Sequence, residues 1–98
     1  MAETLTDTER DSSLGPLTEA GWEHDPERDA ISKRFVFRDF AQAFGWMAEI
    51  AIEADKMNHH PEWSNVYKTV DVTLTTHDAA GLTTLDVKLA QKMDAAAK

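Results

Sequence analysis

The chain has 98 residues, a formal net charge of −8 at pH 7 and no cysteine. This length predicts one domain over residues 1–98, with residues 1–4 frayed, and a core small enough to favour self-association. The lack of cysteine excludes disulfides, thiolate zinc sites and cysteine nucleophiles, and it fits a cytoplasmic location. The acidic charge disfavours binding to nucleic acid or to a membrane surface. No apolar run approaches the roughly 20 residues that cross a bilayer, and the polar stretch 1–13 lacks the pattern of a secretory signal.

The first predicted helix begins after Thr6. Thr6 and Glu9 have the spacing of a capping box, in which each side chain accepts a hydrogen bond from the other residue's backbone. Leu14 and Leu17 supply the apolar contacts of this helix. Pro16 weakens or bends it, because proline has no amide proton to donate.

Two strands are expected next, a short one that opens at Trp22 and a second from Ile31 to Phe37. The segment 25–29 between them is rich in aspartate and contains proline, which favour turns, so the two strands are predicted to form a hairpin. Within the second strand, Ile31, Phe35 and Phe37 share one face. We expect this face to meet the core.

A long helix is predicted from Phe40 to about Met57, with Asp39 as its N-cap and Gln42 completing a second capping box. Its apolar residues recur with helical spacing, and we expect this stripe to face the core. The stripe consists of Phe40, Phe44, Met47 and Ala51, widened by Ala43, Ile50 and Ala54.

Strands are predicted over 63–67 and 70–76, and a third helix follows Thr83, where Asp86 again has capping-box spacing. Within 70–76 apolar and polar residues alternate, which is typical of a strand with one solvated face. The order helix, two strands, helix, two strands, helix predicts an α+β fold. Its two layers would be a four-stranded antiparallel sheet and three helices packed on one face of that sheet.

Three of the four histidines, His59, His60 and His77, lie beside predicted loops. Histidine exchanges protons near neutral pH, so these residues are candidates for acid and base catalysis, although adjacent histidines also occur on surfaces without a role. His60 precedes Pro61 and is therefore biased to extended backbone. His59 and His60 can share one pocket only if the chain turns near Asn58.

Three imidazoles could hold zinc, but the ligand spacing of known zinc motifs is absent, so we expect neither a metal nor a cofactor.

Three further residues near the histidines have two interpretations each. Asp55 is either a solvated carboxylate or one that orients a histidine one helical turn away. Asp86 is either a capping residue alone or also a support for the site. Trp63 is either a core aromatic or a binding platform.

A resemblance to a known family rests on two stretches. The segment 55–67, DKMNHHPEWSNVY, followed by 74–77 and by 81–82 with Asp86, resembles the signature of the pterin-4a-carbinolamine dehydratases. Segments upstream are also similar, so the resemblance extends from about Leu5 onward. The chain departs from the family pattern at Asp55, where the family commonly has glutamate, and at Asn58, where it often has aspartate.

The resemblance implies the α+β fold with one four-stranded antiparallel sheet, subunits that form dimers often paired into homotetramers, and a pterin pocket. Its catalytic residues would be His59, His60 and His77. Substrate contacts would come from Asn58, Pro61, Trp63, Thr75, Thr76 and Asp78, with Asp55 and Asp86 in support.

The implied reaction is the dehydration of a 4a-hydroxytetrahydropterin to a quinonoid dihydropterin, without a metal, in the recycling of a pterin cofactor. The substrate would be a small-molecule pterin, and a functional link to an aromatic amino-acid hydroxylase is expected. His59 and His77 would exchange the protons, in either order, and His60 would orient the pterin. The alternative is a non-catalytic dimerisation or assembly partner of the same fold, because fold does not determine function.

Overall fold

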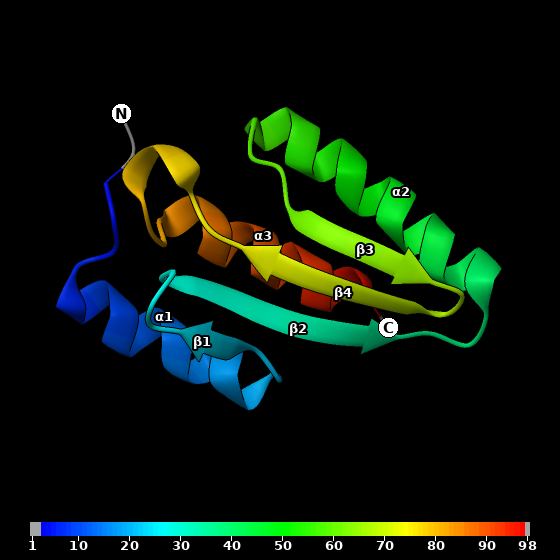
Figure 1. Cartoon of the computed structure of the whole chain (residues 1–98), viewed down its shortest axis with the longest axis horizontal. Helices are drawn as coiled ribbons and strands as arrows, with labels where there is room; N and C mark the ends of the chain where they lie inside the picture. The colour runs from blue at the N-terminus through cyan, green and yellow to red at the C-terminus, as the bar shows by residue number, and fades with distance from the viewer. Residues whose placement is uncertain (1–2, 98) are drawn as a thin grey trace.

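The computed structural model describes residues 3–97. The chain forms helices, a four-stranded sheet and one short 3-10 turn (Figure 1). In chain order the elements are α1 (Asp7–Glu19), β1 (Glu23–Asp25), β2 (Ala30–Val36), α2 (Phe40–Met57), β3 (Glu62–Val66), β4 (Thr69–Leu74), η1 (His77–Ala79) and α3 (Thr84–Ala96). Of the residues expected to be frayed, Met1 and Ala2 lie outside the described part, and Glu3 and Thr4 have no regular structure.

The sheet has the strand order β1-β2-β4-β3, and every neighbouring pair is antiparallel. Val70, Val72 and Leu74 of β4 are buried, whereas Asp71 between them is exposed, so one face of the sheet is covered and the other is open. The helices pack on the covered face. The predicted α+β fold, with two layers and helices on one side, is confirmed.

Side-chain caps determine where the helices begin. The capping box of α1 is present, because Thr6 Oγ1 accepts from the Glu9 amide at 3.1 Å and Glu9 Oε1 accepts from the Thr6 amide at 2.8 Å. At α2, Asp39 Oδ1 accepts from the Gln42 amide at 2.8 Å. The Gln42 side chain, however, accepts from the amide of Arg38 rather than from that of Asp39. The predicted box at α2 is therefore shifted by one residue.

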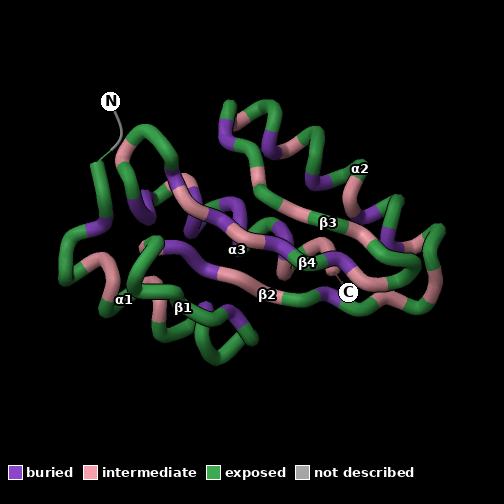
Figure 2. The backbone as a smooth tube through the Cα atoms, viewed as in Figure 1, coloured by how far each residue is buried: buried purple, intermediate pink, exposed green. Residues whose placement is uncertain are grey.

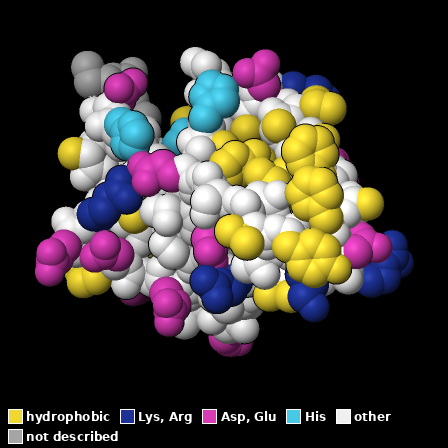
Figure 3. Space-filling model, turned by 45° about the vertical axis from the view of Figure 1, so that its right-hand side comes forward, with side chains coloured by type: hydrophobic (Ala, Val, Ile, Leu, Met, Phe, Trp, Pro, Cys, Tyr) yellow, Lys and Arg dark blue, Asp and Glu magenta, His cyan; other side chains and the backbone are white. Residues whose placement is uncertain are grey.

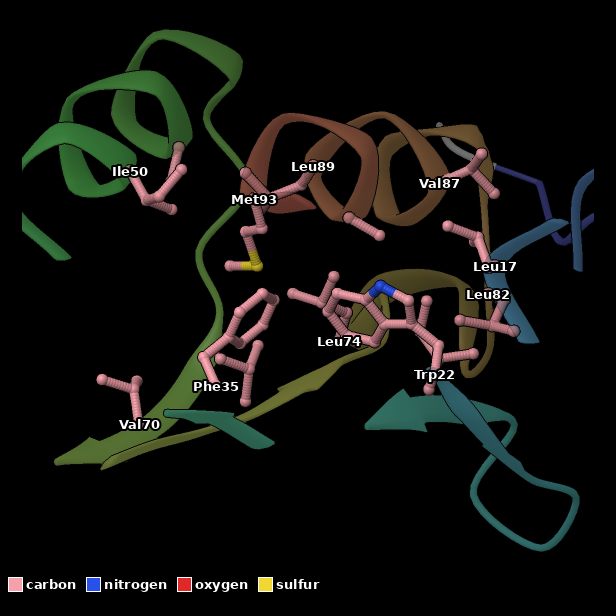
Figure 4. Close-up of a cluster of buried hydrophobic side chains, with 14 of the residues drawn as sticks. Leu17, Trp22, Phe35, Ile50, Val70, Leu74, Leu82, Val87, Leu89 and Met93 are labelled. Atoms are coloured by element: carbon pink, nitrogen blue, oxygen red, sulfur yellow. The ribbon is translucent and has the colours of Figure 1, made fainter. Parts of the chain in front are cut away.

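The core lies between the sheet and α3 (Figure 4). Trp22 and Phe35 point from the sheet side toward Leu89 and Met93, and their rings meet edge to face with centroids 5.9 Å apart. Trp46 of α2 packs on Phe35 at 4.6 Å and donates its indole hydrogen to the Met93 carbonyl at 3.1 Å. The buried indole nitrogen is thus satisfied, as burial of a polar group requires.

The stripe predicted to bury α2 is confirmed at Ala43, Ile50 and Ala54, which are buried, and wrong at Phe40, Phe44 and Ala51. Phe40 and Phe44 are 48% and 56% exposed, and Ala51 is exposed too. The buried face is centred on Trp46 and consists of Ala43, Trp46, Ile50 and Ala54 (Figure 2). The helix is apolar on several sides, so periodicity alone does not say which side meets the sheet. Within residues 3–97, no helix is both long and apolar enough to cross a membrane.

Most of the exposed large apolar residues gather at one end of the molecule, where β2 leads into α2 and where β3 turns into β4 (Figures 1 and 3). We call this surface the apolar end. It consists of Val36, Phe40, Phe44, Val66 and Tyr67, all of which are exposed. The β1–β2 turn, the C-terminal end of α2 and η1 lie at the opposite end, which is rich in polar side chains.

Candidate functional site

A cleft of about 530 Å³ opens at the polar end of the molecule. Its volume lies within the range of roughly 300–1,000 Å³ that is usual for small-molecule sites. Two stretches of chain form its walls, one running from the end of α2 into β3 and the other from the end of β4 into η1, with one residue of α3. The lining residues are Met57, Asn58, His59, His60, Pro61, Glu62, Thr75, Thr76, His77, Asp78 and Leu85.

A left-handed turn at Asn58 places two histidines in this cleft. Asn58 has φ 52° and ψ 42°, and the His59 amide donates back to the Ala54 carbonyl at 3.0 Å, which ends α2. Asparagine is one of the few residues besides glycine that adopt this conformation readily. The turn meets the condition that the sequence set for His59 and His60 to share one pocket.

His59 is held by a fully buried carboxylate. His59 Nε2 lies 2.5 Å from Asp86 Oδ1, and only 8% of the His59 side chain is exposed. The second oxygen of Asp86 accepts from the Thr83 amide at 2.9 Å and from Thr76 Oγ1 at 2.8 Å. The predicted capping role of Asp86 is therefore confirmed, and the same carboxylate also fixes the imidazole of His59.

His77 contacts a carboxylate that the sequence did not single out. Its Nε2 lies 2.9 Å from Glu62 Oε2, and the Arg28 guanidinium donates to both oxygens of Glu62 at 3.1 and 2.8 Å. These hydrogen bonds, first that of Arg28 and then that of His77, lower the pKa of Glu62 to about 2. Glu62 is consequently ionised throughout the physiological range.

His60, like His77, has a largely exposed side chain. Its Nε2 lies 3.2 Å from Asp55 Oδ1, and the two side chains are 60% and 83% exposed. An ion pair this exposed contributes little to stability, because water and salt screen it. Asp55 therefore contacts a histidine, as its orienting interpretation required, but this contact stabilises the position of His60 only weakly.

Each histidine of the cleft has the same arrangement: Nε2 contacts a carboxylate, and Nδ1 does not. An ionised carboxylate only accepts hydrogen bonds, so the imidazole donates from Nε2. In the neutral ring the lone pair then lies on Nδ1. The arrangement supplies three imidazoles in a defined tautomer, which is what proton exchange with a ligand requires.

The β1–β2 turn supports the cleft from behind. Asp29, in the left-handed region at φ 51°, accepts from Arg10 at 2.8 and 2.7 Å and contacts His24 Nε2 at 2.8 Å. The Arg10 hydrogen bond is the main cause of the lowered pKa of Asp29. The backbone carbonyl of Asp29 accepts from Thr75 Oγ1 at 3.0 Å, so this turn fixes a lining residue of the cleft.

The structure brings most of the predicted site residues together. The three histidines, Asn58, Pro61, Thr75, Thr76 and Asp78 line the cleft, and Asp55 and Asp86 contact its histidines without lining it. Trp63 is the exception. It lies outside the lining and packs against Trp46, with ring centroids 6.1 Å apart, which is the core role named as its alternative.

Three lining residues were missed from the sequence, namely Met57, Glu62 and Leu85. For Glu62 a signal existed, because it follows His60-Pro61 directly and alternation along a strand turns it away from the inward-facing Trp63. In the part of the chain that the structure describes, no three histidine, aspartate or glutamate side chains converge as a metal site would require.

Comparison with known proteins identifies one family. The family model described as pterin 4 alpha carbinolamine dehydratase matches residues 3–96. A protein from Jannaschia sp. (strain CCS1), provisionally named pterin-4-alpha-carbinolamine dehydratase, is 62% identical over 94 residues, which cover 96% of each chain. A protein of the same provisional name from Roseobacter denitrificans is 60% identical over 97 residues, which cover 99% of each chain.

Two solved structures share the fold. One, described as a transcriptional coactivator/pterin dehydratase from Brucella melitensis, has a TM-score of 0.89 and 48% identity and covers 98% of this chain and all of its own. The other, a pterin dehydratase-like protein described as a RuBisCO assembly factor in the alpha-carboxysome, has a TM-score of 0.68 and 22% identity. It covers 79% of this chain and 89% of its own. The extent of the family match and the identity of the relatives show that this chain belongs to the pterin-4-alpha-carbinolamine dehydratase family.

Proposed function

We propose that the protein is a lyase that dehydrates a 4a-hydroxytetrahydropterin to the quinonoid dihydropterin. The observation that carries the proposal is the meeting of three imidazoles, from two distant stretches of chain, around one cleft of about 530 Å³. In each imidazole Nε2 contacts a carboxylate, and Nδ1 is left to exchange a proton with a ligand. The family to which the chain belongs supports the same class of reaction.

In the proposed reaction, one imidazolium donates a proton to the hydroxyl on C4a, and the C4a–O bond breaks with loss of water. One neutral imidazole removes the proton from N5, whose electrons form the C4a–N5 double bond. The net change is the loss of one water. The two imidazoles leave the step with their protonation states exchanged, and proton exchange with solvent restores them. We assign these roles to His59 and His77, in either order, and the orientation of the pterin to His60.

Positioned acid and base groups account for the expected acceleration. Such groups contribute roughly 10²–10⁴ in rate, which suffices for a reaction that already proceeds in water. The substrate would be supplied by a pterin-dependent aromatic amino-acid hydroxylase, and the product would be ready for reductive recycling. We place this activity in the cytoplasm, because a chain without cysteine fits a reducing compartment.

The test is a rapid-kinetic assay of dehydration on enzymatically generated 4a-hydroxypterin, with a metal chelator present. The His60→Ala/His77→Ala double variant should lose the acceleration. Lys88→Ala changes an exposed residue of α3 outside the cleft lining and should keep it. Full activity of the double variant would refute the assignment of the histidines, and an inactive wild-type protein would refute the dehydratase proposal.

We also propose that the protein forms a homo-oligomer through its apolar end. Val66 is 76% exposed and Tyr67 62%, and exposed apolar residues that cluster in this way usually mark a protein interface. In the described part of the chain β3 pairs only with β4, so its outer edge is free for another strand. A second copy would cover both features at once.

The second candidate function is a non-catalytic assembly partner. The apolar end favours it, because that surface would equally fit another protein, and one protein of similar fold is described as an assembly factor. The dehydration assay separates the candidates. An assembly partner would show no acceleration in the wild type and no difference between the wild type and the histidine variants.

A further inference from the structure

A bidentate ion pair stands beside His77 at the rim of the cleft. Arg28 comes from the β1–β2 turn, Glu62 is the first residue of β3, and His77 follows β4, so three separate segments meet here. The Arg28 guanidinium uses two nitrogens on the two oxygens of Glu62. A forked contact of this kind fixes the plane of the carboxylate as well as its position.

The contacts of Glu62 determine which nitrogen of the His77 imidazole carries the proton. Arg28 occupies both oxygens, and Oε2 is shared with His77 Nε2 at 2.9 Å. The lowered pKa of Glu62 keeps the carboxylate ionised, so it has no hydrogen to offer. His77 therefore donates from Nε2. All three side chains are partly exposed, so the pair acts through orientation rather than through burial.

We propose that Glu62, held by Arg28, is a positioning residue that fixes the tautomer of His77 and leaves the Nδ1 lone pair for proton exchange with the substrate. The catalytic consequence of this inference rests on the proposed dehydratase function, whereas the tautomer does not. In this arrangement Arg28 acts through Glu62, and Glu62 acts through His77.

A leucine at position 62 gives the sharpest contrast. Glutamine could still place its oxygen where Oε2 lies and accept from both Arg28 and His77 Nε2. Leucine is similar in size and has no acceptor, so nothing fixes the proton on Nε2 and both tautomers of His77 become populated. Arg28→Leu keeps the carboxylate but removes its forked contact, so Glu62 is free to rotate and holds Nε2 less well.

The chain offers a matched control on the open face of the sheet. Arg34 and Asp71 form the same kind of pair, with Nε–Oδ1 at 2.7 Å and Nη2–Oδ2 at 3.2 Å, and no histidine contacts it. Asp71→Leu removes a carboxylate from an arginine pair without touching the cleft. Any effect that Glu62→Leu shares with Asp71→Leu is therefore due to the loss of an ion pair as such.

The experiment records long-range ¹H–¹⁵N NMR spectra of the full chain at a pH of about 8.5, where histidine is neutral. His77 signals are assigned by their loss in His77→Ala. We expect the Nε2–H tautomer in the wild type and in Asp71→Leu, and a mixture of the two tautomers in Glu62→Leu and, to a smaller extent, in Arg28→Leu. An unchanged tautomer in Glu62→Leu would overturn the role of Glu62, and an unchanged one in Arg28→Leu would overturn that of Arg28.

Kinetics provide the second readout. Glu62→Leu should lower kcat about tenfold with little change in KM, a smaller loss than the roughly 10² expected for removing a proton-transfer group, because the imidazole remains. Asp71→Leu should leave kcat unchanged. Equal loss in both variants would contradict a specific role for Glu62. An inactive wild-type protein would refute the dehydratase proposal while leaving the NMR result to decide the tautomer.

Discussion

His59 Nε2 and Asp86 Oδ1 lie 2.5 Å apart in a buried contact, whereas His77 and Glu62 form the same contact on an exposed rim. The two histidines thus have similar partners in opposite surroundings. Removal of a partner should affect stability strongly at His59 and weakly at His77, because desolvated groups lose more when a hydrogen bond is broken.

Asp86→Ala should lower the free energy of unfolding substantially. The change leaves the His59 ring nitrogen, the Thr83 amide and the Thr76 hydroxyl without their acceptor, and one unsatisfied buried group alone costs about 1–3 kcal/mol. Urea denaturation followed by tryptophan fluorescence measures the loss. Asp78→Ala, at an exposed cleft residue, should stay within about 0.5 kcal/mol. Equal stability of the two variants would contradict the buried network.

A pair of glycine substitutions should have opposite signs. A Cβ at Gly81 would lie 2.5 Å from Asp29 Oδ2, which Arg10 and the Leu82 amide hold in place, so Gly81→Ala should cost about 1–3 kcal/mol. Gly15 lies inside α1, and a Cβ there meets nothing within 4 Å. Gly15→Ala should stabilise the protein by about 0.5–1 kcal/mol. Thermal or urea unfolding of both variants tests the contrast.

The stability of the protein should fall in acid, and Asp29 should be one of the causes. Its pKa is lowered in the folded state, mainly by the hydrogen bond from Arg10. A lowered pKa means that the unfolded chain binds the proton first, so the stabilisation is present above the ordinary value of about 3.9 and is lost as the pH falls through and below it.

Asp29→Asn removes this dependence. Its urea midpoint should lie below that of the wild type at pH 6 and should change less between about pH 5 and pH 3, the window in which the wild type loses the contribution. Urea titrations at several pH values measure both slopes. Parallel pH profiles for the two proteins would show that Asp29 does not contribute in this way.

Phe44→Glu should dissociate the proposed homo-oligomer. It places a charge within the apolar end, where a second copy would have to desolvate it without a partner. Sedimentation velocity measures the assembly. Gln91→Glu adds the same charge at an exposed position of α3 and should leave the assembly unchanged. A wild-type protein that sediments as a monomer would overturn the proposed interface outright.

The elements of the fold were predictable because local signals and tertiary contacts agree. Thr6 with Glu9 and Thr83 with Asp86 mark the start of α1 and α3, and both capping boxes are present. The alternation in β4 identified the covered face. The side of α2 that is buried was not predictable, because Phe44 and Trp46 are both apolar and only the shape of the sheet decides between them.

The site was predictable at its histidines and less so around them. His59 and His60 stand out as neighbours before a proline, whereas Glu62 and Arg28 are common surface residues 34 positions apart. Nothing local indicates that they meet, since their contact depends on strand order. Trp63 is close in sequence to the histidines but lies outside the cleft lining, because alternation along β3 turns it toward Trp46.

The apolar end and the cleft lie at opposite ends of the molecule, which leaves room for a fluorescent label that touches neither surface. Because no cysteine occurs in the chain, Lys88→Cys on the exposed side of α3 would create a single thiol for attaching a fluorophore, outside both the cleft lining and the apolar end. Such a reporter would allow subunit exchange to be followed during turnover, so that assembly and chemistry could be timed independently in one sample.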